Sequence, residues 1–278
     1  MNRRLFLSNS AAVAAIACAA SLAPRAWAAA SPTALLDAGL SAFLGRHVTW
    51  NAEGTNTAVD YAGVRRERAE LQRLLNGFSR IAMAEFERWP LAARQAFLIN
   101  AYNVWTLALV ADAPADTASI KDLGGLLQSP WRKAFIPFLD ETRSLDDIEH
   151  GLLRGAPEFD EPRIHFAVNC ASIGCPALRP EAFVMERWDA QLEDQTRRFL
   201  RDRTRNRVLE RDPLRVGISS IFDWYGDDFD SAGGVHGFLA RYPDALGLTT
   251  AEAATLRADD ARIEFLDYDW RLNVAANA

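Results

Sequence analysis

The sequence predicts a mostly helical α+β domain with a small antiparallel or mixed sheet. Apolar residues repeat at helical spacing through most of the first half of the chain. Short segments rich in Ile, Val and Phe, typical of strands, occur only later, at residues 163–168, 215–219 and 262–268. Helices followed by a few scattered strands are typical of α+β proteins and not of doubly wound sheets.

Three helices are predicted in the first half. Apolar residues recur every three or four positions over residues 35–44 and again over 61–78. A third helix begins at Trp89-Pro90, because proline is tolerated at the first helical position, where its missing N–H would have no partner. Residues 97–109 of this helix are apolar nearly all round, so we expect it to be the buried central helix.

The second half begins with a helix that has its own start signal. Ser144 and Asp147 have the spacing of a capping box, in which a hydroxyl and an acid satisfy the first free N–H groups. The remaining predicted elements follow in this order: a strand at 163–168, an amphipathic helix at 184–203, a strand at 215–219, a turn or short helix at 221–229, a helix at 235–242 and a strand at 262–268.

Residues 1–28 have the pattern of an export signal, and residues 29–278 form the predicted domain. Arg3-Arg4 is followed by an Ala-rich apolar run and by small residues at Ala26 and Ala28, which suit a signal peptidase. The arginine pair is similar to a twin-arginine signal, although Asn2 stands where Ser or Thr is usual; an ordinary secretory signal is the alternative. The apolar run is shorter than about 18 residues, so no stable membrane anchor is predicted. We therefore expect a periplasmic or secreted protein.

The charge of the chain argues against two classes of partner. The whole chain has a formal net charge of -6, and loss of residues 1–28 removes three arginines and no acid, which gives -9. Nucleic acids and anionic lipid headgroups attract basic proteins, so neither is an expected partner.

Cys170 and Cys175 are the only cysteines after residue 28, and they have three possible uses. An oxidising compartment favours a disulfide, and a loop that contains Gly174 can bring two Cα atoms to about 5.5 Å. A loop this short would gain only roughly 2 kcal/mol of stability. Alternatively, Cys170, Cys175, His165 and His150 have the chemistry of zinc ligands, although oxidation of the thiols would compete.

The third use is a thiol nucleophile activated by a histidine base. His165 is close in sequence, but residues five apart on a strand point to opposite faces, so it would need a bend to reach Cys170. His150 on the preceding helix is a second candidate base. Cys175 could replace Cys170 as the nucleophile if Pro176 begins a helix, because helix N-termini favour a thiolate.

Asn100, Asn103 and Glu149 are candidates to orient the imidazole, as the third member of a triad does. Asn100 and Asn103 share one face of an otherwise apolar helix, so they either face the site or fix helix packing through buried hydrogen bonds. Glu149 and His150 are adjacent on their helix and point in different directions; a solvated helix face is the alternative interpretation there.

Four carboxylates occur within residues 223–230. Their spacing lacks the alternation of an EF-hand calcium loop. An aromatic cluster with helix-capping aspartates is the favoured interpretation. No cofactor or resident metal is predicted.

Six groups of residues resemble one known family. They are 97–103 (FLINAYN), 144–150 (SLDDIEH), 163–170 (RIHFAVNC), Ser172 with Cys175-Pro176, 221–225 (IFDWY) with Asp228-Phe229, and 268–273 (YDWRLN). In this order they resemble the family catalogued as the domain of unknown function number 547. The resemblance implies one domain, often in an exported bacterial protein, without a settled activity. Its polar residues are similar to those of papain-like or transglutaminase-like cysteine hydrolases, which is an analogy of sites only.

The residues and the resemblance together predict a thiol-dependent hydrolase or acyl transferase that acts on amide or peptide-like bonds. The alternative is a non-catalytic periplasmic binding or scaffold module in which Cys170 and Cys175 form a disulfide. In either case the expected partner is a small-molecule or peptide-like ligand.

Overall fold

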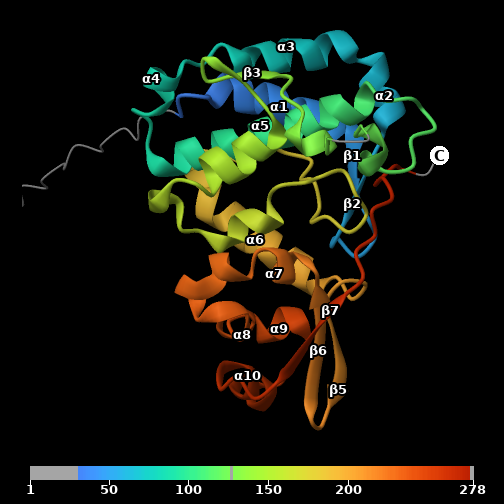
Figure 1. Cartoon of the computed structure of the whole chain (residues 1–278), viewed down its shortest axis with the longest axis vertical. Coiled ribbons are helices and arrows are strands. Elements are labelled where there is room, and N and C mark those ends of the chain that lie inside the picture. Colours follow the sequence, from blue (N-terminus) through green and yellow to red (C-terminus); the bar gives the residue numbers. More distant parts are fainter. Residues whose placement is uncertain (1–30, 126–127, 276–278) are drawn as a thin grey trace, which may run out of the picture. The chain divides into compact units, whose positions relative to one another are not determined.

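The apolar helix α5 (Leu91–Ala111) lies at the centre of the first part of the structure and is buried on almost all sides, as predicted. The helices α1 (Ala34–His47), α2 (Tyr61–Arg66) and α3 (Arg68–Ser79) pack together, and α2 and α3 contact α5 (Figure 1). The ring of Phe97 stacks on Phe78 at 5.2 Å and on Phe138 at 5.3 Å between ring centroids. These aromatic contacts join α5 to α3 and to the hairpin that follows.

The computed structural model describes residues 31–125 and 128–275. The predicted export signal at residues 1–28 lies outside this range. From Ser31 onward the chain clusters into one compact unit. Within the described range, we find no helix whose length and apolar character would let it cross a bilayer.

The helix predicted over residues 61–78 is interrupted. Asp60 begins α2 by accepting the Gly63 N–H at 2.8 Å, and α3 begins again after Glu67. The backbone of Glu67 leaves the helical region (φ −96°, ψ 26°). Its carboxylate lies 2.7 Å from Arg46 and 3.1 Å from His47, both in the last turn of α1. The interruption thus brings the start of α3 to the end of α1.

The strands form two hairpins and one mixed sheet. The hairpins, which were not predicted from the sequence, are β1 (Val48–Trp50) with β2 (Thr57–Val59) and β3 (Ile136–Phe138) with β4 (Glu141–Arg143). In the third sheet β5 (Arg207–Arg211) is antiparallel to β6 (Leu214–Ser219), which is parallel to β7 (Arg262–Leu266). The predicted strands at 215–219 and 262–268 are therefore confirmed as β6 and β7.

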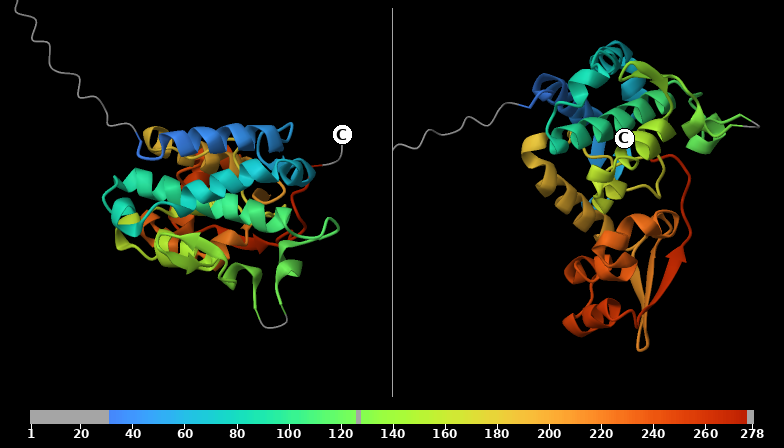
Figure 2. Two further views of the ribbon diagram at one scale, coloured as in Figure 1. Left: turned by 90° about the horizontal axis from the view of Figure 1, so that it is seen from above. Right: turned by 60° about the vertical axis from the view of Figure 1, so that its left-hand side comes forward.

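The C-terminal part has its own apolar cluster, built largely from Phe166, Phe199, Phe222, Phe229 and Phe238. The amphipathic helix predicted over 184–203 is α6 (Trp188–Arg201), which contacts α5 on one side and the C-terminal helix α9 on the other (Figures 1 and 2). The remaining helices are α4 (Met83–Phe86), α7 (Ile221–Trp224), α8 (Gly234–Leu239), α9 (Pro243–Leu246) and α10 (Thr250–Arg257).

The strand predicted at 163–168 is wrong: these residues form the 3₁₀ helix η5 (Pro162–Phe166). Glu161 accepts the Arg163 N–H at 3.1 Å, and Pro162 stands at the first helical position. Ile164 and Phe166 are both buried, but Ile164 belongs to the first apolar cluster and Phe166 to the second. The apparent alternation comes from a segment buried between two clusters, not from a strand with one buried face.

Further 3₁₀ segments connect these elements: η1 (Ile120–Leu123), η2 (Pro130–Arg132), η4 (Pro157–Phe159), η6 (Met185–Arg187) and η7 (Gly226–Ala232). The helix predicted after Ser144 is the π-helix η3 (Asp147–Leu153). After β7 the chain runs back along the first apolar cluster, where Leu272 pairs with Ser172 and Val274 with Val59 (Figure 1). This return brings Tyr268 and Trp270 next to the Cys170–Cys175 loop.

Candidate functional site

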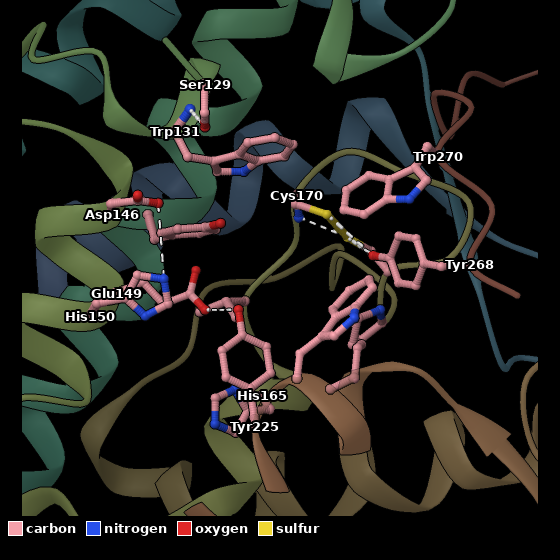
Figure 3. Close-up of a pocket in the computed structure, with 16 residues that line it drawn as sticks. Ser129, Trp131, Asp146, Glu149, His150, His165, Cys170, Tyr225, Tyr268 and Trp270 are labelled. Atoms are coloured by element: carbon pink, nitrogen blue, oxygen red, sulfur yellow. Dashed lines mark hydrogen bonds and ion pairs between the residues drawn. A yellow bond between two sulfur atoms is a disulfide. The ribbon is translucent and has the colours of Figure 1, made fainter. Parts of the chain in front are cut away.

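A cavity of about 170 Å³ opens beside the Cys170–Cys175 loop. Its walls are mainly aromatic: Tyr102, Trp131, Trp224, Tyr225, Tyr268 and Trp270. Its other lining residues are Ser129, Asp146, Glu149, His150, His165, Val168, Cys170, Cys175, Pro176 and Ile221. In Figure 3, Cys170 and Tyr268 lie on one side of the cavity, and Glu149, His150 and His165 lie on the other.

Cys170 and Cys175 form a disulfide, with their Cα atoms 6.2 Å apart. The Tyr268 hydroxyl donates to Cys175 Sγ at 3.0 Å and lies 3.3 Å from Cys170 Sγ. The Cys170 N–H also donates to Cys175 Sγ, at 2.9 Å. Burial raises the pKa of Tyr268 well above its ordinary value, so its hydroxyl remains a donor. Across residues 31–125 and 128–275, no imidazole forms a hydrogen bond with either sulfur.

The zinc alternative finds no support in this geometry. In the described part of the chain, no three His, Cys, Asp or Glu side chains come together as metal ligands. The two cysteines are joined to each other, and a metal-binding thiolate needs a free sulfur.

His165 is 2% exposed and forms part of a charged network with Asp228 and Arg154. Its Nε2 lies 2.6 Å from Asp228 Oδ2, and the Arg154 guanidinium binds both oxygens of Asp228, at 2.6 and 2.9 Å. Burial alone would raise the pKa of Asp228, but the hydrogen bonds from His165 and Arg154 outweigh it and hold this pKa below its ordinary value. The Tyr225 ring stacks on His165 at 4.1 Å between centroids.

Glu149 is 5% exposed and accepts a hydrogen bond from the Tyr225 hydroxyl at 2.8 Å (Figure 3). It forms no ion pair with any described residue. Its neighbour His150 is exposed, and His150 Nδ1 lies 2.7 Å from Arg154. Burial, followed by the nearby Glu149 carboxylate, raises the pKa of Tyr102 and of Tyr225. Both hydroxyls therefore stay protonated beside this carboxylate.

The predicted helix cap in front of Glu149 is confirmed. Ser144 Oγ accepts the Asp147 N–H at 3.1 Å, and Asp147 Oδ2 accepts the Ser144 N–H at 2.7 Å. These hydrogen bonds hold the pKa of Asp147 below its ordinary value. The cap begins the helical turn at residues 145–146, which leads directly into η3.

Asn103 supports the disulfide loop from behind and does not line the cavity. Its Nδ2 donates to the Ala167 carbonyl at 3.0 Å, and its Oδ1 accepts the Asn169 N–H at 2.8 Å. Asn169 in turn closes the loop, because its Nδ2 donates to the Pro176 carbonyl at 2.7 Å and its Oδ1 accepts the Ala171 N–H at 2.9 Å. These contacts agree with the interpretation that Asn103 fixes helix packing through buried hydrogen bonds.

Asn100 precedes Asn103 on the same face of α5, and it does not line the cavity either. Its side-chain amide forms two hydrogen bonds with the backbone of Phe183, at 2.8 and 2.9 Å. Its Nδ2 also donates to Asp37 Oδ1 at 3.2 Å. Asn100 therefore joins α5 to α1 and to the segment before α6.

Asp37 gives the stability of this buried contact a pH dependence. Burial raises the pKa of Asp37 to about 6, against the opposing hydrogen bonds from Thr33 and Asn100. The folded protein therefore binds more protons than the unfolded chain between about pH 4 and 6. We expect this residue's contribution to the unfolding free energy to increase as the pH falls through that range, and Asp37→Asn to remove the increase.

Denaturant titrations of wild type and Asp37→Asn at several pH values measure this contribution as a difference curve. Other titrating groups cancel in the difference to the extent that the substitution leaves them unchanged. A flat difference curve between pH 4 and 6 would contradict the expectation.

Several site residues were not identified as such from the sequence. Asp228 falls in the acidic segment 223–230, which was interpreted as helix caps, and Tyr268 and Trp270 were named only as part of the family resemblance. Tyr225 and Trp224 were assigned to an aromatic cluster. The high density of Trp, Tyr and Asp in these two segments was the available signal.

The fold and the site define a single-domain α+β protein with an aromatic cavity that contains a carboxylate and a disulfide. Residues 86–200 match the family model described as a protein of unknown function, DUF547. The chain therefore resembles this family over α5, η3 and the disulfide loop, whereas Tyr225, Asp228 and Tyr268 lie outside the matched range. No curated protein and no solved structure matches the chain. The analogy with papain and transglutaminase sites stays a prediction.

Proposed function

We propose that the protein is a binding module whose cavity takes a small, positively charged ligand with an apolar portion, such as an aromatic amine or the amino end of a peptide-like molecule. The observation that carries the proposal is the buried Glu149 carboxylate, which has no ion-pair partner among the described residues and faces aromatic walls. A buried charge is costly unless it is paired, so this site favours a ligand that brings a cation.

The charges around the cavity agree with this ligand class. Asp146 and Glu149 line it, and no lysine or arginine is among its lining residues. Arg154 lies nearby, but both its guanidinium contacts to Asp228 are shorter than 3 Å, so its charge is already paired. Asp146 is likewise paired, with Arg132 at 3.4 Å, so Glu149 is the lining carboxylate that would meet a bound cation.

The aromatic walls suit an ammonium group as well as an apolar portion. Trp270 packs against Tyr268 at 4.5 Å and Trp224 at 5.6 Å between centroids, and Trp224 is 45% exposed. The Trp270 ring already contacts one ammonium, because Lys121 Nζ lies 3.6 Å from its centroid. Such cation–π contacts contribute about 0.5–2 kcal/mol each.

Titration with benzylamine, benzyl alcohol and benzoate tests the proposal, because the three share a ring and differ in charge. Trp131, Trp224 and Trp270 line the cavity, so tryptophan fluorescence is the readout. We expect saturable binding of benzylamine and binding of benzyl alcohol that is weaker by about tenfold or more, the usual loss for a charge-assisted contact. Equal or tighter binding of benzoate would reject a cation site.

We also propose that the protein works outside the cytoplasm. The Cys170–Cys175 disulfide supports this location, because disulfides persist in oxidising compartments and are rare in the cytosol. A fusion of residues 1–28 to a reporter that is active only after export tests it. A reporter that stays in the cytoplasm would contradict the proposal.

The thiol-dependent hydrolase or acyl transferase is a second candidate, and it applies to the reduced protein. It is supported by one observation: Cys170, Glu149 and His150 line the same cavity. In this candidate, hydrolysis of an amide or ester of an aromatic amine requires reductant and is lost in Cys170→Ser. Hydrolysis by the oxidised protein would exclude a thiol mechanism.

A further inference from the structure

We propose that the Cys170–Cys175 disulfide is redox-active: an external thiolate attacks Cys170 Sγ through the cavity, and Cys175 leaves as the thiolate. This activity goes beyond ligand binding and does not depend on the proposed amine. The argument rests on three features of the disulfide: its limited structural role, the access to one sulfur, and the hydrogen bonds to the other.

The disulfide adds little to the stability of its loop. The two cysteines are five residues apart, so closure of this loop is worth only roughly 2 kcal/mol on the chain-entropy model. The same loop is already held by the Asn169 hydrogen bond to the Pro176 carbonyl at 2.7 Å. Asn103 and the pairing of Ser172 with Leu272 fix it to the rest of the fold. Because these contacts hold the loop independently of the disulfide, the disulfide can open without unfolding the protein.

The two sulfurs differ in access. Cys170 is partly exposed and lines the cavity, whereas Cys175 is 2% exposed. An incoming thiolate must approach one sulfur along the disulfide axis, so access selects Cys170 as the site of attack.

The hydrogen bonds select Cys175 as the leaving group. Its sulfur accepts the Cys170 N–H at 2.9 Å and is the nearer of the two sulfurs to the Tyr268 hydroxyl, at 3.0 Å against 3.3 Å for Cys170 Sγ. The buried Arg205 guanidinium, which pairs with Asp202 at 3.0 Å, also donates to the Cys175 carbonyl. Donors to a sulfur favour its thiolate, and a better-stabilised thiolate leaves faster.

The exchange is balanced with two equivalents of a monothiol. The first thiolate forms a bond to Cys170 Sγ while the Cys170–Cys175 bond breaks, and its electron pair remains on Cys175 Sγ. The second thiolate attacks the external sulfur of this mixed disulfide, which releases a small disulfide and the Cys170 thiolate. The protein disulfide is reduced to two thiols and the two external thiols are oxidised to one disulfide; the reverse reaction reduces an external disulfide.

Reduction kinetics of the native protein with 2-mercaptoethanol test the proposal. We expect the disulfide to open without denaturant and the mixed disulfide to be found on Cys170 by mass spectrometry after acid quenching. Tyr268→Phe removes one donor to Cys175 and is expected to slow opening by about tenfold, as for loss of a hydrogen bond to a charged sulfur. Tyr242→Phe is the matched control, because its hydroxyl donates to Glu193 at 3.0 Å, outside the cavity.

A second measurement keeps the proposal falsifiable if Tyr268→Phe does not fold. In Cys170→Ser, the Cys175 thiolate absorbance should titrate below the ordinary thiol pKa of about 8.5. A disulfide that resists reduction until the protein unfolds, a mixed disulfide on Cys175, equal rates for the two tyrosine variants, or an ordinary or raised Cys175 pKa would each overturn the proposal.

Discussion

Replacement of Glu149 by Gln is expected to weaken benzylamine binding by about tenfold or more, because it removes the charge that a bound ammonium would pair with. The fold should survive, since a glutamine oxygen can still accept the Tyr225 hydroxyl that now bonds Glu149 at 2.8 Å. Binding of uncharged benzyl alcohol should change far less, because its contacts are with the aromatic walls. Fluorescence titration of both ligands separates the loss of charge from a loss of cavity shape.

Glu193→Gln is the matched control for this substitution. Glu193 also accepts a tyrosine hydroxyl, that of Tyr242 at 3.0 Å, but it does not line the cavity. We expect wild-type affinity for benzylamine in this variant. If Glu149→Gln binds benzylamine as tightly as Glu193→Gln does, the cation site is wrong, whatever the state of the disulfide.

Asn103→Ala is expected to lower the unfolding free energy by about 2–4 kcal/mol, because it leaves two buried backbone groups without partners and opens a small cavity. The groups are the Ala167 carbonyl and the Asn169 N–H, bonded to Asn103 at 3.0 and 2.8 Å. Since Asn169 holds the disulfide loop, faster amide hydrogen exchange over residues 167–176 should accompany the loss. Denaturant titration and exchange measured by mass spectrometry check both effects.

Asn206→Ala separates general destabilisation from the effect on the loop. Asn206 makes an equivalent pair of backbone contacts in the C-terminal part, to Phe199 at 2.8 Å and Ser219 at 3.3 Å. We expect it to lower stability comparably while exchange over residues 167–176 stays slow under native conditions. Equal protection of this loop in the two variants would show that Asn103 does not position it.

Local signals in the sequence were sufficient where one short segment sets the structure. The all-round apolar character of α5 predicts its burial, and Ser144 with Asp147 predicts the helical turn that leads into η3. The β-branched residues of β6 and β7 predict those strands, although the parallel pairing between them joins segments far apart in the chain. The α+β fold class follows from the order in which helices and strands occur along the chain.

The strand predicted around His165 shows why other features could not be read locally. A period-two pattern assumes that one face is buried against one core, but Ile164 and Phe166 enter different apolar clusters. Because η5 is a 3₁₀ helix, the expectation that His165 and Cys170 point to opposite faces of a strand does not apply. His165 instead pairs with Asp228, which is 63 residues away in sequence.

The sequence by itself determined the α+β class, the central helix and part of the site: Glu149, His150, His165 and the two cysteines. Periodicity and capping act over a few residues, so they can be read along the chain. Only the tertiary structure decided which groups meet: Glu149 with Tyr225, His165 with Asp228, and both sulfurs with Tyr268. These contacts depend on how α7 and the returning C-terminal segment pack against the disulfide loop. Such packing is a property of the folded chain as a whole, because it reflects burial shared among distant segments.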